Sequence, residues 1–191
     1  MDELLALFGM SVDEFSSRVD SIGTDDWSKP TPATQWDVTA LVSHLIDEHR
    51  WMPPLIGGQD LGTAEKMVAA AAANSRGDFA ADWAAASAAS RQAVAEPGAL
   101  DGTVSLSRGQ TPAQEYLVEM IFDAAVHSWD LGKALGENPQ LPDELVSFLH
   151  PIFLQMGDLS ETGAFAKPVE IGDDASASDK LIAATGRDPR A

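Results

Sequence analysis

The stretch IFDAAVHSWDL, residues 121–131, decides how the rest of the chain is interpreted. It is expected to form one helix, in which Asp123 and His127 lie on the same face, one turn apart. Their flanking neighbours are apolar, so the pair is expected to point inward or along a cleft. A carboxylate and an imidazole on a mostly buried face need a partner, because burying an unpaired polar group costs free energy.

A second helix offers that partner in His44. This helix is expected to begin at Val38, after Asp37 as N-cap, and to close at residues 51–52, before Pro53-Pro54. If the two helices pack side by side, His44 converges with the Asp123–His127 pair, and facing helices of a bundle commonly build metal sites in this way. The spacing alone favours a simpler alternative, a core acid and a core histidine that satisfy each other, so both readings stay open at this point.

The rest of the chain is expected to be helical, because apolar residues recur at helical spacing. Further helices are expected over residues 2–22, 63–73, 78–95, 111–135, 142–156 and 179–184, with a short extended segment at 103–106 and irregular structure at 160–178. Thr111 is expected to cap the helix that carries the opening stretch, with Pro112 at its first position and Gln114 completing a capping box. The sum is an all-α single domain over residues 1–191. Four long helices would pack as an up-and-down bundle with long crossover loops and short extra helices.

The composition argues against several classes of partner and of chemical site. The 30 acidic and 12 basic residues give a net charge of −18, which disfavours nucleic acid and anionic membrane surfaces as partners. The absence of cysteine rules out disulfides, thiolate ligands and a catalytic cysteine in this chain, so any thiol must arrive on a small molecule. The acidic N-terminus does not look like a secretory signal, and no apolar run reaches the roughly 18 residues of a membrane span. A cytoplasmic protein is expected.

The candidate ligands allow several metals. Two histidines with one or two carboxylates suit Zn²⁺, Fe²⁺, Ni²⁺ or Mn²⁺, and three protein ligands would leave a position open for water or substrate. Asp47 and Asp130 each follow a candidate histidine by three residues and are expected to orient the imidazoles by accepting their second N–H. Glu48, four residues after His44, is a fourth ligand, a base acting on metal-bound water, or a solvated acid.

A functional role is less strongly indicated for the other charged residues and histidines. Arg91 and Arg108 are candidates for binding a carboxylate of the substrate or of a thiol cofactor, although a plain surface position is the favoured reading for both. His49 and His150 are expected at the surface or at a helix end.

Four segments together resemble a known bacterial family: WDV at 36–38, SHL at 43–45, DAAVHSWDL at 123–131 and TGRDP at 185–189. The family comprises metal-binding proteins related to the N-terminal domain of mycothiol-dependent maleylpyruvate isomerase, within the DinB-like four-helix-bundle superfamily. The resemblance implies a three-ligand metal site of His44, Asp123 and His127. In the isomerase a glutamate takes the position of Asp123, and an additional C-terminal domain contributes to the active site. Maleylpyruvate isomerisation itself is therefore not expected here.

The resemblance implies a cytoplasmic, divalent-metal-binding enzyme that uses a thiol. Zinc is the first choice of metal, with nickel, iron and manganese as alternatives, and the thiol is mycothiol if the host is an actinobacterium. The leading hypothesis is a thiol-dependent transferase or isomerase that acts on a small electrophilic substrate. The alternatives are a metal-dependent hydrolase with Glu48 as base and a metal-binding stress-response module without catalysis. A homodimer is compatible with such a bundle, although no stretch of the sequence marks its face.

Overall fold

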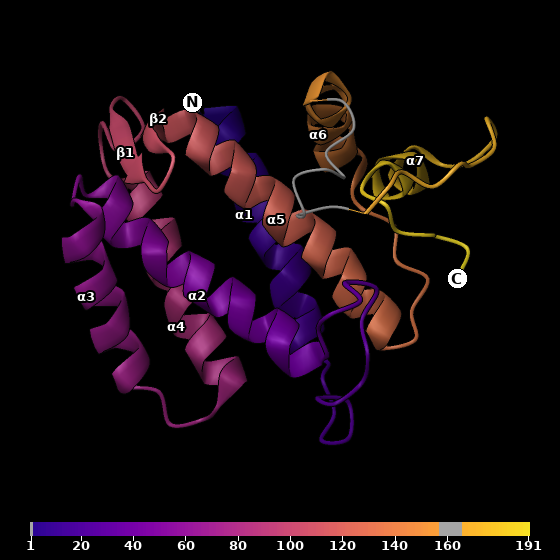
Figure 1. The fold of residues 1–191 in the computed structure, drawn as a ribbon, viewed down its shortest axis with the longest axis horizontal. Coiled ribbons are helices and arrows are strands. Elements are labelled where there is room, and N and C mark those ends of the chain that lie inside the picture. Colours follow the sequence, from indigo (N-terminus) through magenta and orange to yellow (C-terminus); the bar gives the residue numbers. More distant parts are fainter. Residues whose placement is uncertain (1, 157–165) are drawn as a thin grey trace.

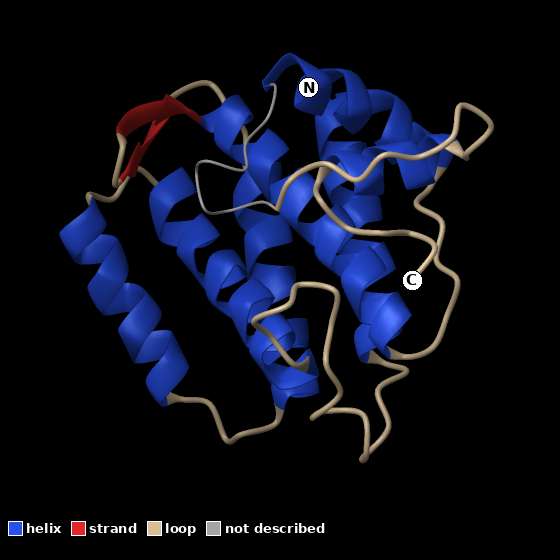
Figure 2. Ribbon diagram, turned by 45° about the vertical axis from the view of Figure 1, so that its right-hand side comes forward, coloured by secondary structure: helices blue, strands red, loops and turns tan. Residues whose placement is uncertain are grey.

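The computed structural model describes residues 2–156 and 166–191 and consists almost entirely of helices (Figures 1 and 2). The elements, in chain order, are α1 (Asp2–Val19), α2 (Val38–Ile56), α3 (Leu61–Ala73), α4 (Phe79–Ala95), β1 (Thr103–Leu106), β2 (Gly109–Pro112), α5 (Ala113–Ala134), α6 (Asp143–Met156) and α7 (Ala177–Ala184). The predominantly helical fold is confirmed. The described structure differs from the expected all-α class in one small feature, the two-stranded β1–β2 hairpin. In the described part, no helix is long and apolar enough to cross a membrane.

Four helices enclose the core. Helix α1 packs mainly on α5 and α2 mainly on α4, while α2 also contacts α5 and α1 also contacts α4 (Figure 1). Helix α5 is buried along most of its length, including every residue from Ala124 to Gly132. The largest fully buried side chains come from α1, α2, α5 and α6, among them Trp129, Phe8, Phe15, Leu41, Leu45, Ile46, Leu117 and Leu149. Polar side chains within this buried stretch therefore lie where solvent cannot satisfy them.

Helix α7 brings the C-terminal end of the chain to α5. It packs against α6, and the Ser178 hydroxyl accepts a hydrogen bond from the backbone N–H of Leu141 at 2.9 Å. Residues 166–176 before it form neither helix nor strand, in agreement with the irregular structure expected there, whereas residues 160–165 of that stretch lie outside the described part. The segment after α7, residues 185–189, reaches α5 through Arg187, whose Nε donates to Asp130 at 2.7 Å.

The C-terminal ends of α1 and α2 depart furthest from the sequence expectation. Helix α1 ends at Val19, three residues early. Helix α2 continues through Pro53 and Pro54 to Ile56, where it was expected to stop. A proline already has a helical φ and costs a helix its N–H hydrogen bond. Here that loss falls in the last turns and is offset by the burial of Pro54 and Leu55 in the core.

The segment before α5 forms a hairpin instead of a capping box. Strand β1 pairs antiparallel with β2, so that Val104 lies opposite Thr111, and Gly109, the first residue of β2, takes a positive φ of +116° as the chain leaves the turn. Thr111 is buried within the strand, and Pro112 occupies the N-cap position without a side-chain hydrogen bond. The expected extended segment at 103–106 is therefore one half of a hairpin, and the expected cap at Thr111 is wrong.

His49 is a core residue, contrary to the expected surface position. Its Nδ1 lies 2.8 Å from the Ser90 hydroxyl, and its ring contacts Phe8 and Trp83. It points away from His44, as the helical spacing requires, but that side of α2 is covered by α4 instead of water. Burial lowers the pKa of His49 to about 3, which keeps its imidazole neutral.

This lowered pKa predicts sensitivity to acid. Below the unfolded-state pKa of 6.5, the unfolded chain binds a proton at residue 49 that the folded chain cannot, so stability falls as the pH drops from 6.5 toward 3. His49→Leu should make the free energy of unfolding less dependent on pH in this range, by at most about 1.4 kcal/mol per pH unit. Denaturant titrations at several pH values measure this, with His150→Leu as the control. Parallel losses of stability in His49→Leu and the wild type would contradict it.

Candidate metal centre

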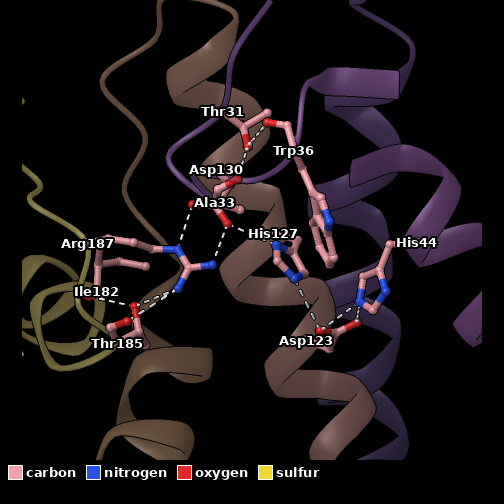
Figure 3. Close-up of polar contacts among 10 residues, drawn as sticks. All are labelled: Thr31, Ala33, Trp36, His44, Asp123, His127, Asp130, Ile182, Thr185 and Arg187. Atoms are coloured by element: carbon pink, nitrogen blue, oxygen red, sulfur yellow. Dashed lines mark hydrogen bonds and ion pairs between the residues drawn. The ribbon is translucent and has the colours of Figure 1, made fainter. Parts of the chain in front are cut away.

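Three potential metal ligands converge between α2 and α5. The Nε2 atom of His44 lies 3.2 Å from Oδ2 of Asp123, and Nε2 of His127 lies 3.4 Å from Oδ1 of Asp123 (Figure 3). One donor atom from each residue lies within 4.8 Å of the other two. Donors on a tetrahedral Zn²⁺ lie about 3.3 Å apart, given bonds of about 2.0 Å. The two histidine–carboxylate separations, 3.2 and 3.4 Å, are therefore close to the separation expected around one ion.

Asp130 orients His127, as expected. Its Oδ2 lies 2.9 Å from Nδ1 of His127, so Nδ1 donates to this carboxylate and Nε2 faces Asp123. The corresponding expectation for Asp47 is wrong. Asp47 is exposed and pairs with Arg50 at 3.2 Å, and no contact with His44 is seen in the described structure.

The arrangement of charges at this site favours a cation between the three candidate ligands. Burial alone would lower the pKa of His127, but Asp123, followed by Asp130, outweighs it and raises this pKa to about 9. Burial would raise the pKa of Asp123, yet the two imidazoles hold it well below its usual range. Carboxylate oxygens and ring nitrogens that face one another are stable only with a positive charge between them, either a proton or a metal ion. This donor set is thus chemically suited to a divalent metal.

Trp36 covers one side of the three residues. The centroid of its ring lies 4.6 Å from that of His44 and 5.3 Å from that of His127 (Figure 3). The loop that carries it is closed by Thr31, whose hydroxyl donates to the Trp36 carbonyl at 2.9 Å. Trp36 was quoted only as part of a motif at the start of α2, so its place in the site was missed.

A cavity of about 580 Å³ opens beside the candidate ligands. Its walls include Trp36, Phe122 and Val126, and the C-terminal segment contributes Thr185 and Arg187. Arg187 donates from Nε and Nη2 to the two carboxylate oxygens of Asp130, each at 2.7 Å. The TGRDP segment was recognised in the sequence, but nothing in its local spacing indicated that Arg187 reaches Asp130.

The remaining candidate residues lie elsewhere. Glu48 is half-buried, one turn after His44, and burial, followed by the charge of Asp123, raises its pKa. It is neither one of the three converging donors nor among the described residues that line the cavity. Arg91 binds Asp13 and the carbonyl of Gly9.

Arg108 pairs with Glu119 through a contact at the protein surface. Because Arg91 and Arg108 are both tied to partners away from the cavity, the structure does not bring them to the site. Arg108 is exposed, in agreement with the favoured surface position, whereas Arg91 is half-buried against α1.

The raised pKa of His127 predicts how the chelator-treated protein responds to alkali. The folded pKa is about 9 against 6.5 for an ordinary histidine, so the stabilisation is complete below pH 6.5 and is lost as the pH rises through 9. It should be on the order of 1–3 kcal/mol. With chelator present, His127→Gln should flatten the decline of the unfolding free energy between pH 7 and 10, and His150→Gln should not. Equal declines in His127→Gln and the wild type would count against the charged pair.

Two relatives and two solved structures resemble the chain. The uncharacterized protein Rv0738 of Mycobacterium tuberculosis strain H37Rv and the uncharacterized protein MT0763 of strain CDC 1551 are each 28% identical over 145 residues, covering 76% of this chain and 74% of the relative. The crystal structure of the mycothiol-dependent maleylpyruvate isomerase matches with a TM-score of 0.61 at 15% identity, over 85% of this chain and 72% of that one.

A variant of that isomerase in which a histidine is replaced by alanine matches with a TM-score of 0.64 at 14% identity, with the same coverage. At these identities the likeness concerns the fold, and it agrees with the expected mostly helical DinB-like architecture. The family described as the mycothiol maleylpyruvate isomerase N-terminal domain matches residues 8–132, which include the three candidate ligands. Since this match covers well over half of the chain, the protein belongs to the family of the mycothiol maleylpyruvate isomerase N-terminal domain.

Proposed function

We propose that the protein binds a divalent metal through His44, Asp123 and His127 and uses a small thiol, of the mycothiol type, in a transfer or isomerisation reaction on a small electrophile. The observation that carries this proposal is the convergence of the three donors beside a cavity. A volume of about 580 Å³ falls within the usual range for small-molecule sites. Membership of a family named for a mycothiol-dependent isomerase supports the thiol-dependent class.

The donor set suits zinc first, with nickel, iron and manganese as alternatives. His44, Asp123 and His127 would hold the ion, and Asp130 would keep Nε2 of His127 turned toward it. A divalent metal held there stabilises the thiolate form of a thiol at neutral pH. Three protein donors leave room for such an external ligand.

The charges around the site favour an anionic ligand. With both imidazoles neutral and Glu48 protonated, Asp123 and Asp130 contribute two negative charges and Arg187 one positive charge, so the site carries −1. A divalent cation changes this to +1, and one thiolate would restore neutrality. Because the site is largely shielded from water, such neutrality is favoured strongly. This balance supports a thiolate over a neutral donor.

The apolar residues of the cavity would exclude water, and Glu48 would handle the proton of the thiol. Trp36, Phe122 and Val126 present apolar walls that exclude water from a bound electrophile. After the thiol has lost its proton, its sulfur would form a bond to the electrophilic carbon of a double bond, whose π electrons would move to the adjacent atom and take up a proton there. Glu48 does not line the cavity, but it lies one turn from His44 and has a raised pKa, so it would hold the thiol proton and return it to the product.

The thiol proposal predicts a paired loss of metal and ligand. Zinc-loaded wild type should contain one metal per chain and bind mycothiol, because the thiolate completes the donor set, while S-methylated mycothiol should not bind. His44→Ala should lose both the metal and the thiol, and His150→Ala should keep both. Elemental analysis and calorimetric titration measure this. A wild type that holds zinc but binds neither mycothiol nor any small thiol would instead favour a non-catalytic metal-binding module.

Glu48 is tested separately. Glu48→Gln removes the proton-holding group without changing side-chain size, so it should keep stoichiometric zinc and mycothiol binding. Conjugation of mycothiol to a panel of small electrophiles, followed by mass spectrometry, should slow by about 10²-fold or more. Loss of zinc in this variant would make Glu48 a ligand, and an unchanged rate would remove it from the reaction.

A further inference from the structure

We propose that Arg187, in the C-terminal segment after α7, is a positioning residue that sets the orientation of His127 through Asp130. The inference deepens the proposed function and rests on His127 being a metal ligand. The family match ends at residue 132, so Arg187 is supplied by a part of the chain that the match does not include. Three links, each with its own geometry, connect the segment to the candidate metal centre (Figure 3).

The first link joins Arg187 to Asp130. The Nε and Nη2 atoms of Arg187 lie 2.7 Å from Oδ1 and Oδ2 of Asp130, a two-pronged pairing that fixes the plane of the carboxylate. The Asp130 side chain has no exposed surface, and that of Arg187 is only 11% exposed. Burial would raise the pKa of Asp130, but the hydrogen bond from His127, followed by the charge of Arg187, lowers it.

The second link joins Asp130 to His127. Oδ2 of Asp130 lies 2.9 Å from Nδ1 of His127, so one carboxylate oxygen serves both the arginine and the imidazole. Without Arg187, the Asp130 carboxylate would be free to rotate and would be buried without its main counter-charge. The hydrogen bond that directs Nε2 of His127 toward Asp123 would then weaken.

The third link holds Arg187 itself in place. Its Nη1 lies 3.2 Å from the Thr185 hydroxyl, and Thr185 is buried at the end of α7. Gly186 adopts a φ of +84°, and a Cβ there would lie 2.6 Å from the carbonyl oxygen of Ala166. Only glycine fits this approach, so the backbone fixes the direction from which Arg187 enters the site.

Arg187 lines the cavity, which raises the question of whether it binds an anionic substrate directly. Its charge is already matched by Asp130, and Nε, Nη1 and Nη2 all have partners within the protein. The geometry therefore assigns Arg187 to holding Asp130. A second reading, in which Arg187 merely fastens α7 to α5, is separated from positioning by the experiment below.

The test compares full-length Arg187→Ala, Arg187→Lys and the control Arg190→Ala, an exposed arginine paired with Asp188. In chelator-treated protein, ¹⁵N–¹H NMR should detect a slowly exchanging proton on Nδ1 of His127 in the wild type and in Arg190→Ala. Both Arg187 variants should lose it, because lysine keeps the charge but cannot present two parallel N–H groups. Competition with a zinc chelator should show zinc affinity about 10–100-fold weaker in both Arg187 variants.

The outcomes separate this inference from the proposed function. If the wild type binds no zinc, the proposed function fails, while the NMR signal still decides whether Arg187 positions His127. If Arg187→Ala does not fold, the Nδ1 proton and the zinc affinity are compared between Arg187→Lys and the wild type. Arg187 variants that melt at a lower temperature but keep both the Nδ1 proton and wild-type zinc affinity would overturn the inference and leave Arg187 as a fastening for α7.

Discussion

The structure depends on one carboxylate, Asp123, held between the imidazoles of His44 and His127. A negative charge on a largely buried helix face requires a positive charge beside it, and the neighbouring groups are arranged to supply or hold one. Helix α5 provides the carboxylate and one imidazole, α2 provides the other, and Trp36 covers the pair from the side. The same requirement recurs at Asp130, where Arg187 and His127 balance a fully buried carboxylate.

Most of the fold could be predicted from apolar periodicity, because each long helix buries one continuous stripe. The errors arose where tertiary packing decided the outcome. Pro53 and Pro54 stay within α2 because its last turns are buried. Thr111 pairs in a strand because β1 lies beside it, a partner that no local capping pattern reveals. His49 was placed at the surface because helical spacing gives the direction of a side chain but not whether another helix, here α4, covers it.

In the candidate site, too, residues that share one helix could be related from the sequence, whereas residues that only tertiary packing brings in could not. Asp123, His127 and Asp130 share one helix, and their spacing was enough to relate them. Placing His44 beside them needed the expectation that two helices pack together, which the structure meets. Trp36 and Arg187 were missed because they reach the site from a loop and from the C-terminal segment, through contacts across long sequence separations. Asp47 follows its histidine at the same spacing as Asp130, but α2 turns it toward solvent, where it pairs with Arg50.

The central claim is that His44, Asp123 and His127 hold a single divalent ion. X-ray absorption spectroscopy of the zinc-loaded, full-length protein tests it most directly, because the scattering from imidazole rings is distinct from that of isolated oxygen ligands. We expect one zinc with two imidazole nitrogens at about 2.0–2.1 Å and at least one carboxylate oxygen. On adding a small thiol, one sulfur at about 2.3 Å should join them. Zinc surrounded by oxygen alone, or by fewer than two imidazoles, would contradict the account.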